Sequence, residues 1–134
     1  MILGLDPGER RVGVAIADLE TRFARPLEVI DLQTTDAIAR IGTLVEEHAV
    51  ALVVVGLPLG LSGDAGPAVA AQSGFIEDLR DRVEVPIEEH DERLTTVLAE
   101  RALKEAGVSR SSRKGLRDAI AAQIILQSYL DSNP

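Results

Sequence analysis

Cysteine is absent from the 134-residue chain, and aromatic side chains make up only 2% of it. The lack of cysteine excludes disulfides and thiol catalysis, and it fits the reducing cytoplasm, where we expect the protein to act. Two histidines without any cysteine are too few for a zinc site. So few aromatic rings also argue against a platform on which nucleic-acid bases stack.

Long uncharged apolar runs are also missing, so we expect no membrane-spanning segment and no membrane partner. The chain enters an apolar segment at Ile2 without a basic leader, and we therefore expect no secretory signal. A composition with 46% apolar and 27% charged residues is typical of a globular protein. At this length a single domain, residues 1–134, is the natural expectation.

The net charge is −8, which is the wrong sign for a protein that holds nucleic acid by general electrostatic attraction. The charge is unevenly spread, however. Acids crowd residues 77–92, whereas residues 109–117, SRSSRKGLR, carry basic charges and no acid. We interpret 109–117 as a loop that either docks a phosphate backbone or is simply solvated.

Hydrophobic patterning predicts an α/β fold. Pro7-Gly8 is turn chemistry between two short apolar runs, and the valine-rich run 51–57 is typical of a strand covered on both faces. The predicted strands are 2–6, 10–17, 27–32, 51–57 and 83–87, and the predicted helices are 35–48, 67–79, 94–107 and 117–130. This order indicates a five-stranded mixed sheet, with three antiparallel meander strands, two parallel strands and helices on both faces.

Acidic residues occupy the places where ligands collect in such a sheet, at the carboxyl ends of strands. Asp6 ends the first strand, Asp91 and Glu92 follow the fifth, and Asp118 opens the last predicted helix, where the helix dipole favours an anion. The alanines that follow Asp118 would let this helix lie close to the sheet. If it packs beside the first strand, Asp118 faces Asp6.

Converging carboxylates repel one another unless hard cations lie among them. Mg²⁺ uses one or two carboxylates, water and substrate phosphate oxygens as ligands, and a pair of such ions stabilises the attacking and leaving oxygens of a phosphodiester displacement. Each acid also has an ordinary structural interpretation. Asp6 could be a turn residue, Asp91 a helix cap, and Asp118 an acid that only meets a helix dipole.

Four segments of the chain, in this order and nearly end to end, resemble the RuvX/YqgF family of RNase H-like nucleases. They are DPGERRVGVAIAD at 6–18, VVVGLPL at 53–59, HDERLTT at 90–96 and KGLRDAIAAQIILQSYL at 114–130. The resemblance implies an RNase H-like fold and cleavage of phosphodiester bonds with Mg²⁺ or Mn²⁺, as two ions. The implied partner is nucleic acid. It would be the precursor of 16S ribosomal RNA, processed at its 5′ end, or branched DNA, by similarity to the RuvC resolvase.

The same resemblance implies roles for individual residues. The metal ligands would be Asp6, Glu92 and Asp118, with Asp91 as a further candidate. Basic residues would contact the substrate: the implied phosphate contacts are Arg93 and Lys114, to which we add Arg113 from the same basic segment. Arg10 and Arg11 stay open between three roles, namely neutralising the acidic cleft, contacting phosphate, or being solvated.

Several alternatives remain open. RuvC-type resolvases place a second acid one turn into the last helix, where this chain has Ala121, and this difference weakens a direct transfer of junction-resolving activity. A non-catalytic nucleic-acid-binding module could keep the fold without needing all three acids. ATP-binding domains of the actin and sugar-kinase type share the fold, but two of them are needed to enclose ATP. Monomer and homodimer are both compatible with the sequence.

Overall fold

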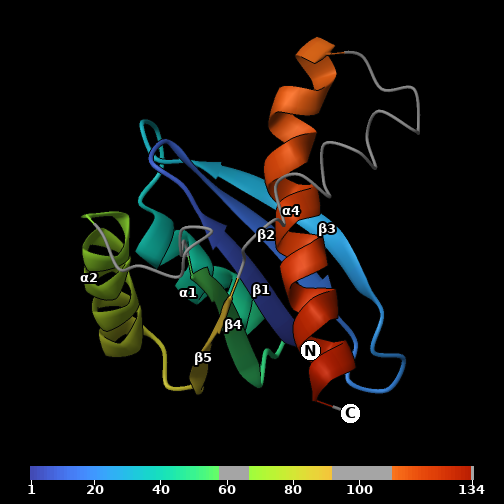
Figure 1. The fold of residues 1–134 in the computed structure, drawn as a ribbon. Coiled ribbons are helices and arrows are strands. Elements are labelled where there is room, and N and C mark those ends of the chain that lie inside the picture. The colour runs from blue at the N-terminus through green and yellow to red at the C-terminus, as the bar shows by residue number, and fades with distance from the viewer. Residues whose placement is uncertain (58–66, 92–109, 134) are drawn as a thin grey trace.

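The computed structural model describes residues 1–57, 67–91 and 110–133, whose strands form a five-stranded sheet with helices on both faces (Figure 1). The strands are β1 (Ile2–Pro7), β2 (Arg11–Ala17), β3 (Ala24–Asp31), β4 (Leu52–Leu57) and β5 (Ile87–Asp91). The helices are α1 (Ala37–Glu47), α2 (Pro67–Arg82) and α4 (Arg110–Ser132). In the described part of the chain, no helix is both long and apolar enough to cross a membrane.

The strand order is β3-β2-β1-β4-β5. β2 is antiparallel to both β1 and β3, whereas β1, β4 and β5 run parallel to one another. The predicted mixed sheet is therefore confirmed, and the three parallel strands end at a common edge. The predicted helix 94–107 lies outside the described residues.

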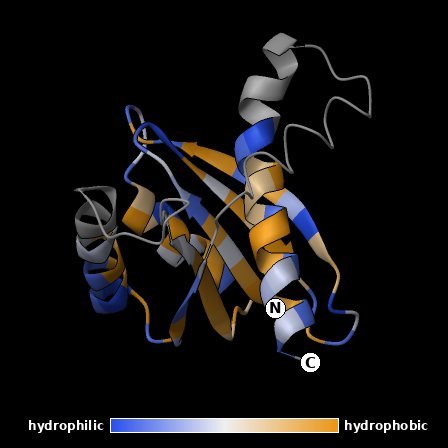
Figure 2. Ribbon diagram, in the orientation of Figure 1, coloured by the Kyte–Doolittle hydropathy of each residue, from blue (hydrophilic) through white to orange (hydrophobic). Residues whose placement is uncertain are grey.

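Alternation along the strands divides the core into two layers. In β2, Val12, Val14 and Ile16 pack toward α1 and α2, while Ala15 and Ala17 belong to the layer beneath α4. Figure 2 shows the corresponding concentration of apolar residues on the strands and on the middle of α4. Alternate side chains of a strand point to opposite faces, so the position of a residue in the strand decides which helix it meets.

Small residues let α4 lie close to the sheet. A Cβ on Gly4 of β1 would lie 2.7 Å from Leu126 Cβ and 3.3 Å from the Ala122 carbonyl oxygen. Ala119, Ala121 and Ala122 are all buried, as expected from the run of alanines that begins α4's contact with the sheet. Contact this close leaves no room for a side chain on β1 at this point.

Several boundary predictions were wrong. The first helix begins at Ala37 instead of residue 35, because Asp36 caps α1 and its carboxylate accepts a hydrogen bond from the Ala39 amide. The fifth strand is Ile87–Asp91 instead of 83–87. Val83 still donates its amide to Leu79 O at the end of α2, so the chain turns only afterwards. β3 also begins three residues earlier than predicted, at Ala24.

Residues 110–117, the described part of the basic segment, are helical rather than a loop. α4 runs from Arg110 to Ser132, and its first turns extend beyond the strand ends (Figure 1). Asp118 therefore lies inside the helix instead of opening it. The helix dipole acts mainly on the first turn, so it does not account for an acid at this position.

Candidate active site at the carboxyl edge of the sheet

The approach of α4 to the end of β1 depends on Gly13 in β2. Asp6 and Gly13 are register partners in the antiparallel pair, so their Cα atoms lie about 5 Å apart. A Cβ on Gly13 would lie 1.8 Å from the carbonyl oxygen of Asp118 and 2.4 Å from its carbonyl carbon. The Asp118 backbone thus rests directly on Gly13, beside the residue that carries Asp6.

The side chain of Asp6 projects from the same sheet face. Gly4, two residues earlier in β1, faces α4, and alternate residues of a strand share a face. Asp6 and Asp118 are both half-buried. The expected packing of the last helix beside the first strand is confirmed, and it brings these two acids to one end of one face.

Arg11 pairs with Asp118. Its Nε donates a hydrogen bond to Asp118 Oδ2 at 2.7 Å, and the two side chains are 30% and 19% exposed. Arg11 lies two residues before Gly13 in β2, so it points to the α4 face. The charge of Arg11 is therefore paired with that of Asp118, one of the acids of the candidate site.

The Arg11 backbone is well fixed at the start of β2. Its carbonyl accepts a hydrogen bond from the Gly8 amide at 2.8 Å, which closes the turn after β1. The ion pair itself keeps solvent contact on both sides, so we assign it about 1 kcal/mol, the upper end for exposed pairs. Its importance lies in its position, since it joins the turn after β1 to the acid on α4.

Asp91 ends β5 at the same edge of the sheet. It is level with Leu57 of β4, and Val55 of β4 is level with Leu5 of β1. The ends of β1 and β5 are thus separated by one strand, a spacing of about 10 Å. Glu92 and Arg93 directly follow Asp91 in the chain and lie outside the described residues.

The donor set of the described acids fits a hard divalent cation. Mg²⁺ needs only one or two carboxylates, with water and phosphate oxygens as further ligands, and Asp6 and Asp118 supply two. Within residues 1–57, 67–91 and 110–133, no group of three or more possible metal-binding side chains comes together. A third acidic ligand would therefore have to come from outside these ranges, where Glu92 lies.

The remaining basic candidates take two positions. Arg113 and Lys114 belong to the first turns of α4, with Lys114 one turn before Asp118. Arg10 is exposed beside the turn after β1, and its carbonyl accepts a hydrogen bond from Leu32 at 2.9 Å. Basic residues therefore come from two elements near Asp118: the preceding turns of α4 and the turn before β2.

A second polar cluster, which the sequence did not predict, joins β5 to the far end of α4. The Tyr129 hydroxyl donates to Glu88 Oε2, and His90 Nε2 lies 2.9 Å from Ser128 Oγ. The rings of His90 and Tyr129 meet edge to face with centroids 6.0 Å apart. The hydrogen bond to Glu88, together with partial burial, raises the pKa of Tyr129 above its ordinary value. His90 therefore contacts α4 through both Ser128 and Tyr129.

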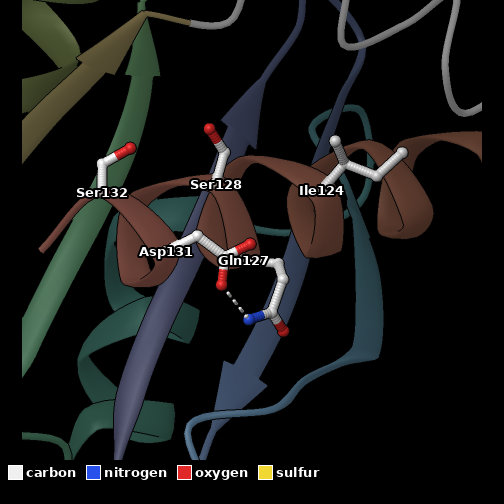
Figure 3. Close-up of a pocket in the computed structure, with 5 residues that line it drawn as sticks. All are labelled: Ile124, Gln127, Ser128, Asp131 and Ser132. Atoms are coloured by element: carbon white, nitrogen blue, oxygen red, sulfur yellow. Dashed lines mark hydrogen bonds between the residues drawn. The ribbon is translucent and has the colours of Figure 1, made fainter. Parts of the chain in front are cut away.

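A shallow pocket of about 350 Å³ lies on this far end of α4 (Figure 3). Gln127 Nε2 donates a hydrogen bond to Asp131 Oδ1 there, at 3.1 Å. The pocket centres near Ser128, ten residues after Asp118, which is about 15 Å along the helix. Gln127 also accepts a hydrogen bond from the Ala24 amide of β3, so this region anchors the helix and is separate from the acidic edge.

Sequence reasoning missed Gly13 and the partner of Arg11. A signal for Gly13 was present, because Gly13, Ala15 and Ala17 alternate with bulky residues in β2 and thereby mark a face that a helix can approach closely. The same alternation explains why Arg11, and not Arg10, pairs with Asp118. Once Gly13 is known to face α4, Arg11, two residues earlier, must face α4 as well.

Comparison with known sequences gives consistent matches over almost the whole chain. Residues 1–132 match the model of a family described as "RuvX: Holliday junction resolvase". A protein of Chloroflexus aggregans named "Putative pre-16S rRNA nuclease" is 50% identical over 132 residues, which cover 98% of this chain and 93% of the relative. A relative of the same name from Streptococcus sanguinis is 43% identical, with 98% of both chains covered.

Solved structures share the fold at low sequence identity. RuvC of T. thermophilus, in complex with a Holliday junction substrate, superimposes with a TM-score of 0.58 at 18% identity and covers 98% of this chain and 93% of its own. The fowlpox virus resolvase in complex with Holliday junction DNA gives a TM-score of 0.55 at 10% identity, with 98% and 97% covered. These likenesses confirm the RNase H-like arrangement of the sheet.

Proposed function

The chain belongs to the RuvX family, and on that premise we propose that it is a cation-dependent nuclease that hydrolyses phosphodiester bonds. The observation that carries the proposal is the direct contact of the Asp118 backbone with Gly13, which brings Asp118 and Asp6 to one end of one sheet face. Two carboxylates at one end of one sheet face repel each other, and a shared divalent cation would offset that repulsion while using both as ligands.

The proposed ligands are Asp6, Glu92 and Asp118, with Asp91 as a fourth candidate, and the ions are Mg²⁺ or Mn²⁺, two in number. When bound, they supply Lewis acidity to the phosphate and activation of the attacking water. The chain itself supplies position. β1 holds Asp6 at a strand end, and α4 holds Asp118 on a rigid helix, so that neither carboxylate depends on a loop for its place.

Contacts to the phosphate backbone are assigned to the basic residues around this edge. Lys114 and Arg113 precede Asp118 in α4, and Arg93 follows the end of β5 by two residues. Arg10 is a further candidate because it is exposed next to the turn after β1. Such residues would let a protein of net charge −8 hold a polyanion locally.

For the substrate we propose the precursor of 16S ribosomal RNA, processed at its 5′ end in the cytoplasm during ribosome biogenesis. The relatives' name supports this choice. Branched DNA is the second candidate, supported by the description of the family. Against it stands Ala121, only 2% exposed, where resolvases of the RuvC type have a second acid on the helix. We further propose that residues 1–134 act as a single domain.

The test is cleavage of a 16S precursor RNA and of a four-way DNA junction in Mg²⁺ or Mn²⁺, with EDTA as the metal-free control. We expect Asp6→Asn and Asp118→Asn each to lower the rate by about 100-fold or more, because each removes a charge that holds the cation. Asp78→Asn, which makes the same change at an exposed position of α2, should keep full activity. Cleavage that persists in EDTA and in both site variants would refute the proposal.

A further inference from the structure

We propose that Arg11 is a built-in counterion of Asp118 that competes with the divalent cation, so that Arg11 sets how tightly the site binds its metal. The inference rests on the proposed metal-binding role of Asp118. It assigns to Arg11 a positioning role, in which it acts on the reaction through Asp118 and makes no contact with the substrate.

The geometry of the ion pair carries the first step. Arg11 Nε lies 2.7 Å from Asp118 Oδ2, so a guanidinium occupies lone pairs that a cation would use. A bound cation must either displace Arg11 or share the carboxylate with it. Displacement weakens cation binding because the ion pair must be broken. Sharing weakens it because the two positive charges repel each other, more strongly where burial lowers the dielectric.

The second step concerns the protein without its cation. Asp6 and Asp118 lie at one end of the same sheet face, and two neighbouring carboxylates destabilise each other when both are ionised. Arg11 offsets this repulsion by placing a positive charge between the start of β2 and α4. When a cation binds, it takes over that task, and the contribution of Arg11 to folding stability becomes smaller.

Arg10 provides a matched control. It is adjacent in the chain, carries the same charge and is exposed, and within the described residues its side chain makes no hydrogen bond or ion pair. Substituting Arg10 or Arg11 by Gln changes the net charge by the same amount. A difference between the two variants therefore reports the contact with Asp118 and excludes a general electrostatic effect.

The experiment measures Mn²⁺ binding by calorimetry and by the paramagnetic signal of free Mn²⁺, together with thermal unfolding in EDTA and in excess Mn²⁺. Arg11→Gln should bind Mn²⁺ about fivefold more tightly than the unsubstituted protein, which is the low end of typical coupling between two ligands. Its Tm should fall in EDTA, and the deficit should shrink in Mn²⁺. Arg10→Gln should change neither quantity by as much. Arg11→Lys, which keeps the charge, should bind Mn²⁺ within about twofold of the unsubstituted protein.

The outcomes separate the two proposals. If Mn²⁺ binding requires Asp118, as tested with Asp118→Asn, but Arg11→Gln binds no more tightly than Arg10→Gln, the competition is overturned and the metal site stands. If the unsubstituted protein binds no Mn²⁺, or Asp118→Asn binds it equally well, the metal site itself fails and the competition fails with it. A Tm deficit of Arg11→Gln that is equal in EDTA and in Mn²⁺ also overturns the competition.

Discussion

At the scale of single residues, the most consequential position is one without a side chain. Gly13 has no catalytic chemistry, yet the Asp118 backbone occupies the space where its Cβ would be. Gly74 in α2 is its opposite, since a Cβ there would meet nothing within 4 Å. The same residue type is thus required by close approach at one position and is dispensable at the other.

Gly13→Ala should destabilise the protein by about 3 kcal/mol, because a methyl group cannot share space with the Asp118 carbonyl and α4 must shift. The same shift should lower cleavage activity. Urea unfolding measures the first effect. Gly74→Ala is the control and should stabilise the protein by about 0.5–1 kcal/mol, since alanine suits a helix interior better than glycine. Equal stability of Gly13→Ala and the unsubstituted protein would contradict the described packing.

At the scale of elements, α4 is held at two points by different chemistry. In its first half, Arg11 and Gly13 of β2 contact Asp118, and near its end the Tyr129 hydroxyl donates a hydrogen bond to Glu88 of β5. Between these points the helix is fixed by buried apolar side chains that include Ile125 and Leu126. The polar contacts fix which residues of the helix lie over which strand, since apolar packing alone is less specific.

Tyr129 is the only tyrosine, and tryptophan is absent, so tyrosinate absorbance reports this residue alone. We expect its titration midpoint to lie above 10.0, because the hydrogen bond to Glu88 and partial burial both favour the neutral phenol. Glu88→Ala should lower the midpoint. Glu89→Ala, the neighbouring exposed acid of β5, should leave it nearly unchanged. An equal shift in both variants would argue against the specific hydrogen bond.

The raised pKa of Tyr129 also predicts a pH dependence of stability. The folded protein holds the phenol proton more tightly than the unfolded chain does, so the contribution is complete below pH 10.0 and is lost as pH rises through the raised value. Chemical denaturation at increasing alkaline pH should therefore show a smaller loss for Tyr129→Phe than for the unsubstituted protein. An equal loss of stability in both proteins would show that groups other than Tyr129 cause the alkaline sensitivity.

Much of the fold could be predicted because β1, β2 and β4 are apolar and separated by turn residues. The last strand was misplaced because β5 carries Glu88, Glu89 and His90, and a strand at a sheet edge needs few apolar residues. The start of α4 was missed because RSSRKG, residues 110–115, lacks apolar residues, and hydrophobic periodicity therefore gives no signal for a helix there.

The candidate site was predictable in part. Strand ends collect ligands, and this rule led from the sequence to Asp6. Asp118 was selected because it was expected to open the last helix, and that premise was wrong, since α4 begins at Arg110. The pairing of Arg11 with Asp118 spans 107 residues of sequence. It depends on which of two adjacent arginines faces α4, a choice that a shift of one residue in the strand would reverse.

At the scale of the whole molecule, charge is segregated. The acids of residues 77–91 belong to α2, β5 and the turn between them, whereas the basic residues of 110–117 belong to the first turns of α4. We expect a nucleic acid that approaches this molecule to be repelled over the first region and attracted by the second. Orientation of the substrate should therefore depend on ionic strength.

The double variant Arg113→Ala/Lys114→Ala should bind nucleic acid more weakly and with a flatter salt dependence. The slope of log Kd against log salt should fall by about one to two, since each lost phosphate contact removes close to one released counterion. Binding titrations over a range of salt concentrations measure this slope. Arg80→Ala/Arg82→Ala, which removes the same charge from the last turn of α2, should leave the slope unchanged. An unaltered slope in the first variant would show that these residues do not contact phosphate.

The contact between Asp118 and Gly13 joins residues that are synthesised far apart in time. Asp6 and Gly13 leave the ribosome before Asp118, which follows only after all five strands of the described sheet have been made. Synthesis proceeds at about 5–20 residues per second, so several seconds separate the two halves of the site. During that interval the nascent chain carries Asp6 but not yet Asp118. An enzyme proposed to cut a ribosomal RNA precursor would thus remain inert until the ribosome that makes it has passed Asp118.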